Sequence, residues 1–276
     1  MTETWRPRLV VLDLDGTTVQ MNQTEPSPRV RRAVRATMAA GVPVGVATGR
    51  AVWSSLPATA ALGIDQPQAL SMVCSNGAVV YDAARRRAVH RAVIDPGPAL
   101  RALAAARPEA GFAAEHGVLG YRYTRQFVRD FPSNFLEEVE LSVLGAEPTT
   151  RLSGRLPGIP IQRAHSRCES ATEWVTESGL DPADYSLEIG FSGWVDVCAP
   201  GVSKAGGVAL LARDIGVEPS DVLVIGDGSN DLSMFAWAGR SIAMGQAPPE
   251  VRAAADEVTA SVEDDGVALA LERWFG

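Results

Sequence analysis

Residues 9–17 have the sequence LVVLDLDGT, which combines an apolar segment with a polar, glycine-containing turn. Its first four residues are apolar with two β-branched valines in the middle, which is typical of a strand buried on both faces of a parallel sheet. The strand is expected to end at Asp13, so two carboxylates, Asp13 and Asp15, follow directly after it. Ligand sites of parallel α/β sheets lie beyond the carboxyl ends of the strands. The stretch therefore predicts a parallel sheet and a polar site at its edge.

Helical and strand-like segments alternate after this strand. Pro28 suits the first position of a helix whose apolar residues recur at helical spacing until Gly41. Residues 42–47 predict a second buried strand, a further helix follows, and residues 70–74 predict a third strand. This order predicts an α/β fold with a doubly wound, Rossmann-like parallel sheet and right-handed crossovers.

The alternation is interrupted in the middle of the chain and returns near its end. The middle predicts short strands and one good helix, which indicates an inserted α+β domain. Later elements are predicted as helices at 204–215 and 231–238 and strands at 222–225 and 241–244. A length of 276 residues also favours two domains. We predict a core of residues 1–82 and 199–276 and an inserted cap of residues 83–198.

The composition is that of a globular protein and argues against several classes of partner. With 46% hydrophobic and 21% charged residues the chain is not expected to be disordered. A net charge of −8 opposes nucleic-acid binding, and the one dense basic cluster, residues 85–87, is expected to be a solvated turn. The sequence has no secretion signal and no apolar run near the roughly 20 residues that span a bilayer. We expect a cytoplasmic protein without membrane partners. The sequence contains no heptad repeat, so it makes no prediction of the oligomeric state.

Polar residues follow each predicted strand of the core. The second strand leads into TGR at 48–50, the third into SNGA at 75–78, and a later one into GDGSND at 226–231. Carboxylates gathered at one rim repel each other, and a divalent cation relieves that repulsion. A helix cap or loop would explain any one acidic turn. Their repeated position at strand ends instead favours a common site.

The oxygen ligands of this site predict Mg²⁺. Asp13, Asp227 and Asp231 supply hard carboxylate oxygens, the donors that Mg²⁺ prefers. The three histidines of the chain lie outside the motifs, so a histidine-rich zinc or iron site is disfavoured.

These residue types allow phosphoryl transfer. Asp13 could attack phosphorus to form an aspartyl phosphate, and Asp15 could protonate the leaving oxygen and later deprotonate water. The Thr48 hydroxyl and the Gly49 N–H could hold phosphate oxygens, and Lys204 could add positive charge at a helix start. Taken alone, Thr48 would be a helix N-cap and Lys204 a solvated lysine.

The motifs resemble a known family. DLDGT at 13–17, TGR at 48–50, Lys204 and GDGSND at 226–231 are similar to the four ordered motifs of the haloacid dehalogenase-like (HAD) phosphatase superfamily. SNGA at 75–78 and the tail from AMGQAP at 243–248 resemble its Cof-type branch, which has a large C2-type cap between the second and third motifs. One departure is Gln246, which stands where the family usually has asparagine.

The resemblance implies a role for each matching residue. It implies Asp13 as nucleophile and Asp15 as acid and base. It implies phosphate contacts from Thr48, Lys204 and Asn230, and a Mg²⁺ site formed by Asp13, the Asp15 carbonyl, Asp227 and, through the metal shell, Asp231.

The expected function is a Mg²⁺-dependent phosphatase for a small phosphorylated metabolite, such as a sugar phosphate or a cofactor-related phosphate. A phosphosugar mutase is the alternative enzyme. A non-catalytic phosphometabolite-binding module is disfavoured because Asp13, Asp15 and Lys204 are all present. Candidate cap residues for the substrate are Phe112, Glu115, His116, Tyr121, Arg122, Tyr123, Arg125, Glu188, Phe191, Trp194 and Asp196.

Overall fold

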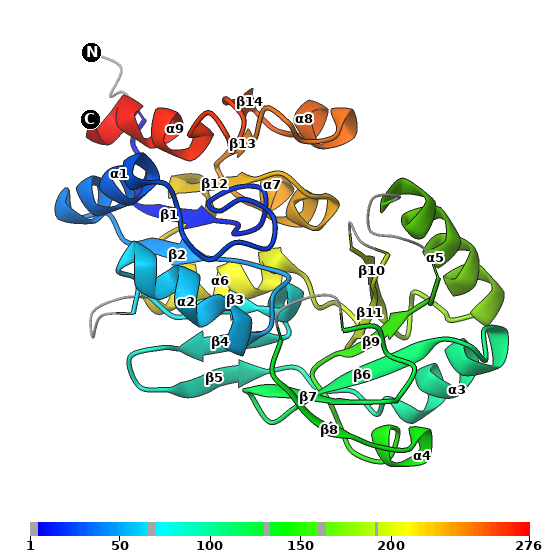
Figure 1. Ribbon diagram of the computed structural model, residues 1–276. Coiled ribbons are helices and arrows are strands. Elements are labelled where there is room, and N and C mark those ends of the chain that lie inside the picture. Colours follow the sequence, from blue (N-terminus) through cyan, green and yellow to red (C-terminus); the bar gives the residue numbers. More distant parts are fainter. Residues whose placement is uncertain (1–4, 66–69, 130–132, 159–163, 191–192) are drawn as a thin grey trace. The chain divides into compact units, whose positions relative to one another are not determined.

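A computed structural model describes residues 5–65, 70–129, 133–158, 164–190 and 193–276. They form two compact units. The core unit comprises the chain up to His90 and from Ser203 onward, and the cap unit comprises Arg91–Val202. Each unit is built on its own large sheet, as the ribbon in Figure 1 shows.

The core unit contains a five-stranded parallel sheet in the order β14-β13-β12-β1-β2. Its strands are β1 (Leu9–Leu12), β2 (Val44–Val46), β12 (Val222–Gly226), β13 (Arg240–Ala243) and β14 (Glu257–Val258). Because β1 lies between β2 and β12, the first and last parts of the chain share one sheet. The predicted α/β fold with a doubly wound core is confirmed.

Successive side chains of β1 explain why helices cover both faces of this sheet. Val10 and Leu12 pack on one face with α1, α2 and α9, and Leu9 and Val11 pack on the other with α6, α7 and α8. The helices are α1 (Pro28–Ala39), α2 (Val52–Leu62), α6 (Lys204–Asp214), α7 (Leu232–Trp237), α8 (Pro249–Ala254) and α9 (Gly266–Phe275). Burying each such side chain contributes about 1.5–3 kcal/mol, so the sequence LVVL fixes the sheet between two helical layers.

The third predicted strand lies outside the parallel sheet, which corrects the sequence prediction. This strand, β3 (Met72–Cys74), pairs antiparallel with β4 (Val79–Asp82) in a three-stranded sheet with β5 (Arg87–Arg91). Among the described residues, one isolated parallel bridge, Ala47 to Val73, joins it to the end of β2. The reason is the turn η1 (Ser75–Gly77), whose three residues have φ of 52°, 55° and 104°. This left-handed turn reverses the chain before a crossover helix can begin.

Two smaller features complete the core. The 3₁₀ turns η3 (Pro219–Asp221) and η4 (Ser229–Asp231) flank β12. The basic cluster at 85–87 is exposed and lies at the turn from β4 into β5, as predicted.

The cap unit is an α+β structure with a six-stranded sheet in the order β10-β11-β9-β6-β7-β8. Its strands are β6 (Gly111–His116), β7 (Gly120–Tyr123), β8 (Phe135–Glu138), β9 (Leu152–Arg155), β10 (Ser186–Ile189) and β11 (Val195–Cys198). Its helices are α3 (Gly97–Ala106), α4 (Leu141–Leu144) and α5 (Ala164–Ser178). One face of the sheet packs against α3 and α5 around Phe112, Leu152 and Trp174.

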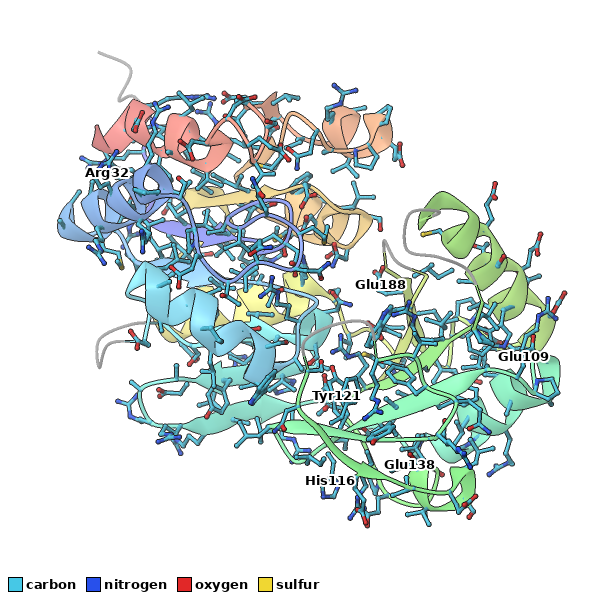
Figure 2. All side chains as sticks on the ribbon, viewed as in Figure 1. Arg32, Glu109, His116, Tyr121, Glu138 and Glu188 are labelled. Carbon is cyan, nitrogen blue, oxygen red and sulfur yellow. The ribbon has the colours of Figure 1, made fainter. Side chains whose placement is uncertain are left out.

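A buried ionic cluster lies among the strands of the cap sheet. The Arg151 guanidinium contacts Glu115 at 2.9 Å, Asp196 at 3.0 Å and the Tyr121 hydroxyl at 2.5 Å. Figure 2 draws these side chains on the ribbon and labels Tyr121. Three predicted cap candidates thus meet around an arginine that the sequence did not single out, while Phe191 lies outside the described residues.

Among the described residues, no helix is both long enough and apolar enough to cross a membrane.

Candidate active site

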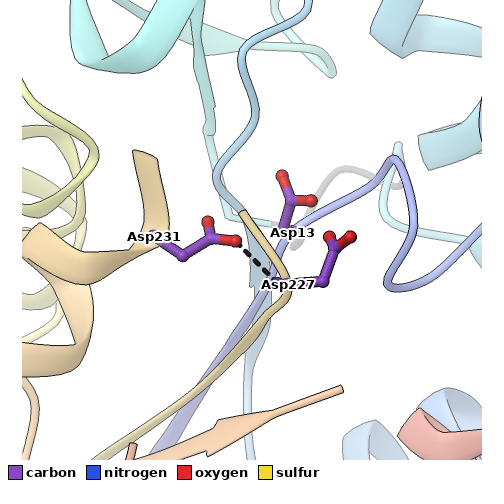
Figure 3. A group of neighbouring side chains, drawn as sticks. All are labelled: Asp13, Asp227 and Asp231. Atoms are coloured by element: carbon purple, nitrogen blue, oxygen red, sulfur yellow. Dashed lines mark hydrogen bonds between the residues drawn. The ribbon is translucent and has the colours of Figure 1, made fainter. Parts of the chain in front are cut away.

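The carboxyl ends of β1 and β12 bring acidic residues from opposite ends of the chain together. The strands are parallel neighbours, and the Asp13 N–H donates to the Ile225 carbonyl at 2.9 Å. Asp13, Asp227 and Asp231 each place a carboxylate oxygen within 4.8 Å of the others (Figure 3). Strand pairing therefore produces the acidic cluster that the strand-end positions predict.

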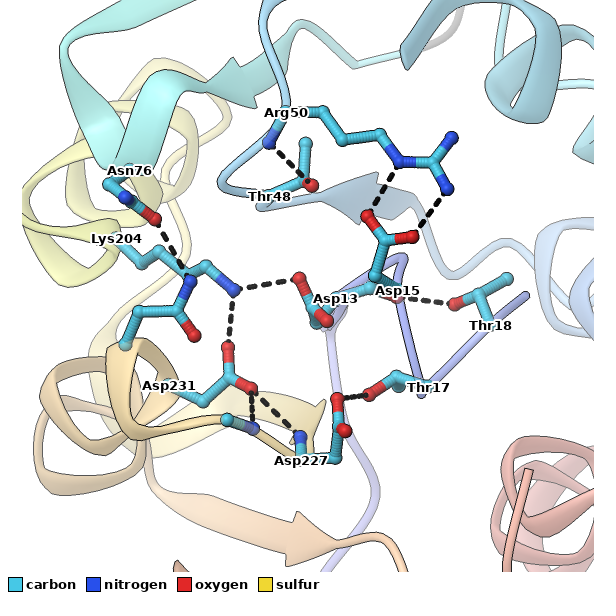
Figure 4. Close-up of polar contacts among 12 residues, drawn as sticks. Asp13, Asp15, Thr17, Thr18, Thr48, Arg50, Asn76, Lys204, Asp227 and Asp231 are labelled. Atoms are coloured by element: carbon cyan, nitrogen blue, oxygen red, sulfur yellow. Dashed lines mark hydrogen bonds and ion pairs between the residues drawn. The ribbon is translucent and has the colours of Figure 1, made fainter. Parts of the chain in front are cut away.

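Lys204 neutralises part of this cluster. It begins α6 after the N-cap Ser203, and its Nζ donates to Asp13 Oδ1 at 2.7 Å and to Asp231 Oδ1 at 2.6 Å (Figure 4). Burial alone would lower the pKa of the Lys204 ammonium, but the two aspartates together hold that pKa well above its usual value. The lysine is therefore a fixed positive charge within the site.

Lys204 is also the only lysine in the sequence, since the rest of its 25 basic residues are arginine. An ammonium is a compact point charge that can lie between two carboxylates, whereas a guanidinium is a planar fork. The single lysine in a chain otherwise rich in arginine therefore marks the site in the sequence, independently of the spacing of the motifs.

The two carboxylates nearest the strand ends have raised pKa values. Burial raises the pKa of Asp13 well above the ordinary carboxyl value, against the opposing effect of Lys204, and Asp231 and Asp227 add to the rise. Burial and then the charge of Asp231 raise the pKa of Asp227 to about 6. The neighbouring carboxylates repel one another, which favours protonation of one of them. A divalent cation bound among them relieves the same repulsion. The set of hard oxygen donors fits Mg²⁺.

The loop after β1 approaches Asp227 closely. Gly16 has φ of 76°, and a Cβ there would overlap the Asp227 carboxylate. The next two hydroxyls tie the loop down, because Thr17 Oγ1 donates to Asp227 Oδ1 at 2.9 Å and Thr18 Oγ1 donates to the Asp13 carbonyl at 2.5 Å. Only glycine allows this approach at position 16.

Asp231 is held from both sides. Its Oδ1 accepts from Lys204, and its Oδ2 accepts from the backbone N–H groups of Asp227 and Gly228, both at 2.8 Å. These bonds shape the loop that carries Asp227.

The Asp15 side chain lies apart from the acidic cluster and pairs with Arg50. The guanidinium donates from Nε to Asp15 Oδ2 at 2.6 Å and from Nη2 to Oδ1 at 2.5 Å. The sequence motif TGR contains Arg50, but spacing alone gives it no role. The pairing arises from the fold of the loop that follows Asp15.

Of the predicted phosphate-contact residues, Thr48 and Gly49 follow β2, Asn230 follows β12 and Lys204 begins α6. Thr48 is buried, and its carbonyl accepts from the Asn76 N–H at 3.1 Å. Asn230 Nδ2 donates to Asn76 Oδ1 at 2.9 Å, and a Cβ at Gly49 would lie 3.1 Å from that same oxygen. Asn76 therefore connects Thr48, Gly49 and Asn230, a role that its place in the SNGA motif does not reveal.

The Gln246 side chain also forms hydrogen bonds within the site, although the family usually has asparagine at this position. Its Nε2 donates to the Gly16 carbonyl at 2.6 Å and reaches Asp227 Oδ2 at 3.4 Å. Its Oε1 accepts from the Val262 N–H at 3.1 Å. Gln246 thus joins the first loop to Asp227.

Comparisons with known proteins agree with this architecture. A haloacid dehalogenase-like hydrolase from Bacteroides thetaiotaomicron has a TM-score of 0.77 and 23% identity, covering 98% of this chain and 99% of that one. A HAD subclass IIB sugar phosphatase has a TM-score of 0.77 and 22% identity over 96% of this chain and 98% of that one. At these identities the matches show a shared fold, with the inserted unit included.

Sequence matches to curated relatives are shorter. Phosphoglycolate phosphatase from Methanothermobacter thermautotrophicus is 36% identical over 94 residues, which are 34% of this chain and 42% of that protein. The match therefore spans less than half of that relative's length.

A family model settles the assignment because it covers nearly all of the chain. The model, described as haloacid dehalogenase-like hydrolase, matches residues 10–271. The resemblance to this superfamily is confirmed. The chain belongs to the haloacid dehalogenase-like hydrolase family.

Proposed function

We propose that the protein is a Mg²⁺-dependent phosphatase that hydrolyses a small phosphorylated metabolite through an aspartyl phosphate on Asp13. The observation that carries the proposal is the convergence of Asp13, Asp227 and Lys204 at one edge of the core sheet. Enzymatic phosphoryl transfer depends mainly on positioning and on charge stabilisation. Both requirements are met by this group of residues.

Each residue of the core has a proposed part in the reaction. Asp13 attacks phosphorus, and Asp15 exchanges a proton first with the leaving oxygen and then with water. Lys204 neutralises charge on Asp13 and on the incoming phosphate, with Thr48, Gly49 and Asn230 as further phosphate contacts. The buried ion pair with Lys204 opposes the rise in the pKa of Asp13 that burial causes, and so favours the ionised nucleophile.

The proposed metal ligands are Asp13, Asp227 and the Asp15 carbonyl. Mg²⁺ bound there supplies neutralisation of the phosphoryl oxygens. Asp231, whose oxygens already accept from Lys204 and two backbone N–H groups, acts on the metal site by orienting the Asp227 loop.

The substrate class is tested by a phosphate-release screen. Sugar phosphates come first because one structure with this fold is a sugar phosphatase, and phosphoglycolate follows because one relative acts on it by name. Nucleotides, pyridoxal phosphate and flavin precursors complete the panel. Mg²⁺-dependent phosphate release supports the proposal, whereas isomerised sugar phosphate without net release would indicate a mutase instead. We assign the choice among these compounds to the cap unit, Arg91–Val202.

Metal binding is expected to depend on pH. The raised pKa of Asp227 means that its stabilising contribution to the metal-free fold is fully present below about pH 4 and is lost as the pH rises through about 6. Mg²⁺ competes with that proton, so it should raise the Tm more at about pH 7.5 than at about pH 5. Thermal unfolding with Mg²⁺ and with EDTA measures this difference. An equal Tm increase at both pH values, or undiminished hydrolysis after chelation, would contradict the metal assignment.

Gln246→Ala is expected to weaken Mg²⁺ binding by about tenfold, because residues that orient metal ligands typically contribute 10–100-fold to affinity. The variant loses the side chain that joins the Gly16 carbonyl to Asp227. The measurement is the Mg²⁺ concentration at half of the maximal Tm shift. Gln20→Ala, at an exposed position of the same loop, is the matched control. Equal Mg²⁺ midpoints for the two variants would show that Gln246 does not support the site.

A further inference from the structure

We propose that Arg50 is a positioning residue that presents one oxygen of Asp15, Oδ2, for proton transfer. The inference rests on the proposed phosphatase function and concerns how its proton donor is oriented. It starts from the bidentate pair between the Arg50 fork and both Asp15 oxygens, at 2.6 and 2.5 Å. A bidentate arginine fixes the plane of a carboxylate as well as its position.

Arg50 is itself fixed by the surrounding backbone. Its Nη2 donates to the Gln23 carbonyl at 2.7 Å, and its Nη1 donates to the Ser54 carbonyl at 3.2 Å in the first turn of α2. The Arg50 carbonyl accepts from the Ser75 N–H at 2.8 Å, which ties the residue to the left-handed turn after β3. Arg50 is therefore anchored to three segments of the core, to two through its guanidinium and to the third through its backbone carbonyl.

The hydrogen bonds of Asp15 distinguish its two oxygens. A carboxylate offers about four acceptor positions, two on each oxygen. Oδ1 accepts from Arg50 Nη2 and from the Asn22 N–H at 3.1 Å, so both of its positions are used. Oδ2 accepts from Arg50 Nε. Among the bonds formed by the described residues, one position is left, and it lies on Oδ2.

This geometry gives each half of the reaction a defined proton path. In the first half, a bond forms between an Asp13 oxygen and phosphorus while the ester P–O bond breaks, and the proton on Asp15 Oδ2 passes to the leaving oxygen. In the second half, water attacks phosphorus and releases Asp13, and Oδ2 takes the proton from water. The Arg50 fork stays bound to the carboxylate throughout and needs no proton of its own.

The test compares two substrates that differ in their need for a proton donor. The leaving group of an alkyl phosphate such as glycerol phosphate is a strongly basic alkoxide, which needs a proton. The leaving group of p-nitrophenyl phosphate is a stable phenolate. General acid catalysis contributes about 10²–10⁴-fold, so Arg50→Ala should lower kcat/KM for the alkyl phosphate about 100-fold more than for the aryl phosphate. The measured quantity is kcat/KM for each substrate, because kcat/KM does not depend on the second half of the reaction.

Three further variants make the test specific. Asp15→Asn should show the same selective loss, and the Asp15→Asn/Arg50→Ala double variant should lose little more than either single variant. Arg50→Lys keeps the charge but not the fork, so it should also be selective, and it serves if Arg50→Ala does not fold. Arg29→Ala removes another bidentate pair, with Glu272 at 3.0 and 2.6 Å, and should leave the ratio unchanged.

The outcomes separate this inference from the proposed function. Equal losses on both substrates for Arg50→Ala and Arg50→Lys, or no selectivity in Asp15→Asn, would overturn the role of Arg50 in positioning. The proposed function fails on a different result, which is phosphate release that does not require Asp13.

Discussion

Asp13→Asn is expected to abolish phosphate release, with kcat lowered by at least about 10⁴-fold. An amide is a poor nucleophile and cannot form the acyl phosphate, so the loss comes from chemistry and not from shape. The substitution is nearly isosteric, and the backbone bond from position 13 to Ile225 is retained, so the fold should persist. Phosphate release under saturating substrate and Mg²⁺ measures the effect, and thermal unfolding checks the fold.

The matched control for this variant is Asp214→Asn, at the exposed end of α6. It makes the same chemical change in the same unit and should retain full activity. Turnover of Asp13→Asn at a rate close to that of Asp214→Asn would exclude aspartyl-phosphate chemistry on Asp13.

Lys204→Met is expected to have the second largest effect, on activity and stability together. It leaves Asp13 and Asp231 buried without their shared cation, and removal of one partner from a buried ion pair typically costs about 3–5 kcal/mol. The free energy of unfolding in EDTA at about pH 7.5 should fall by that amount. Because burial raises the pKa of Asp13, protonation relieves the unpaired charge in acid, and the deficit should shrink as the pH falls.

Lys204→Arg separates charge from geometry. It restores a positive charge but replaces the compact ammonium with a planar fork, so it should recover part of the stability while phosphate release stays low. The unique lysine also allows a direct observation, since lysine-selective ¹⁵N labelling gives a single side-chain ammonium. An unchanged unfolding free energy in Lys204→Met would show that the ion pairs around Lys204 do not support the site.

The features of the fold that could be predicted from sequence are those that depend on the local pattern of apolar and polar residues. The apolar run at 9–12, with valines in its middle, predicts a fully buried strand, and parallel pairing then brings Asp13 beside the loop that carries Asp227. The acidic cluster is a direct consequence of strand direction. The positions of the motifs at strand ends are therefore sufficient to predict it.

The features that sequence did not predict depend on backbone conformation and long-range contacts. The strand at β3 has the right apolar pattern, but its sheet is decided by the left-handed turn at Ser75 and Asn76, which no hydrophobic period reveals. The pairing of Arg50 with Asp15 and the contacts of Gln246 likewise require the folded loop after β1. The cap cluster around Arg151 joins strands far apart in the chain.

The proposed mechanism requires one cation and one phosphoryl group to meet at Asp13. Crystals grown with Mg²⁺ and beryllium fluoride, a mimic of a carboxyl-bound phosphoryl group, test this requirement. We predict the fluoride complex on a carboxylate oxygen of Asp13, with Mg²⁺ bound by the other oxygen, by Asp227 and by the Asp15 carbonyl. Density for the metal away from Asp13 and Asp227, or for the fluoride on any other residue, would contradict the account.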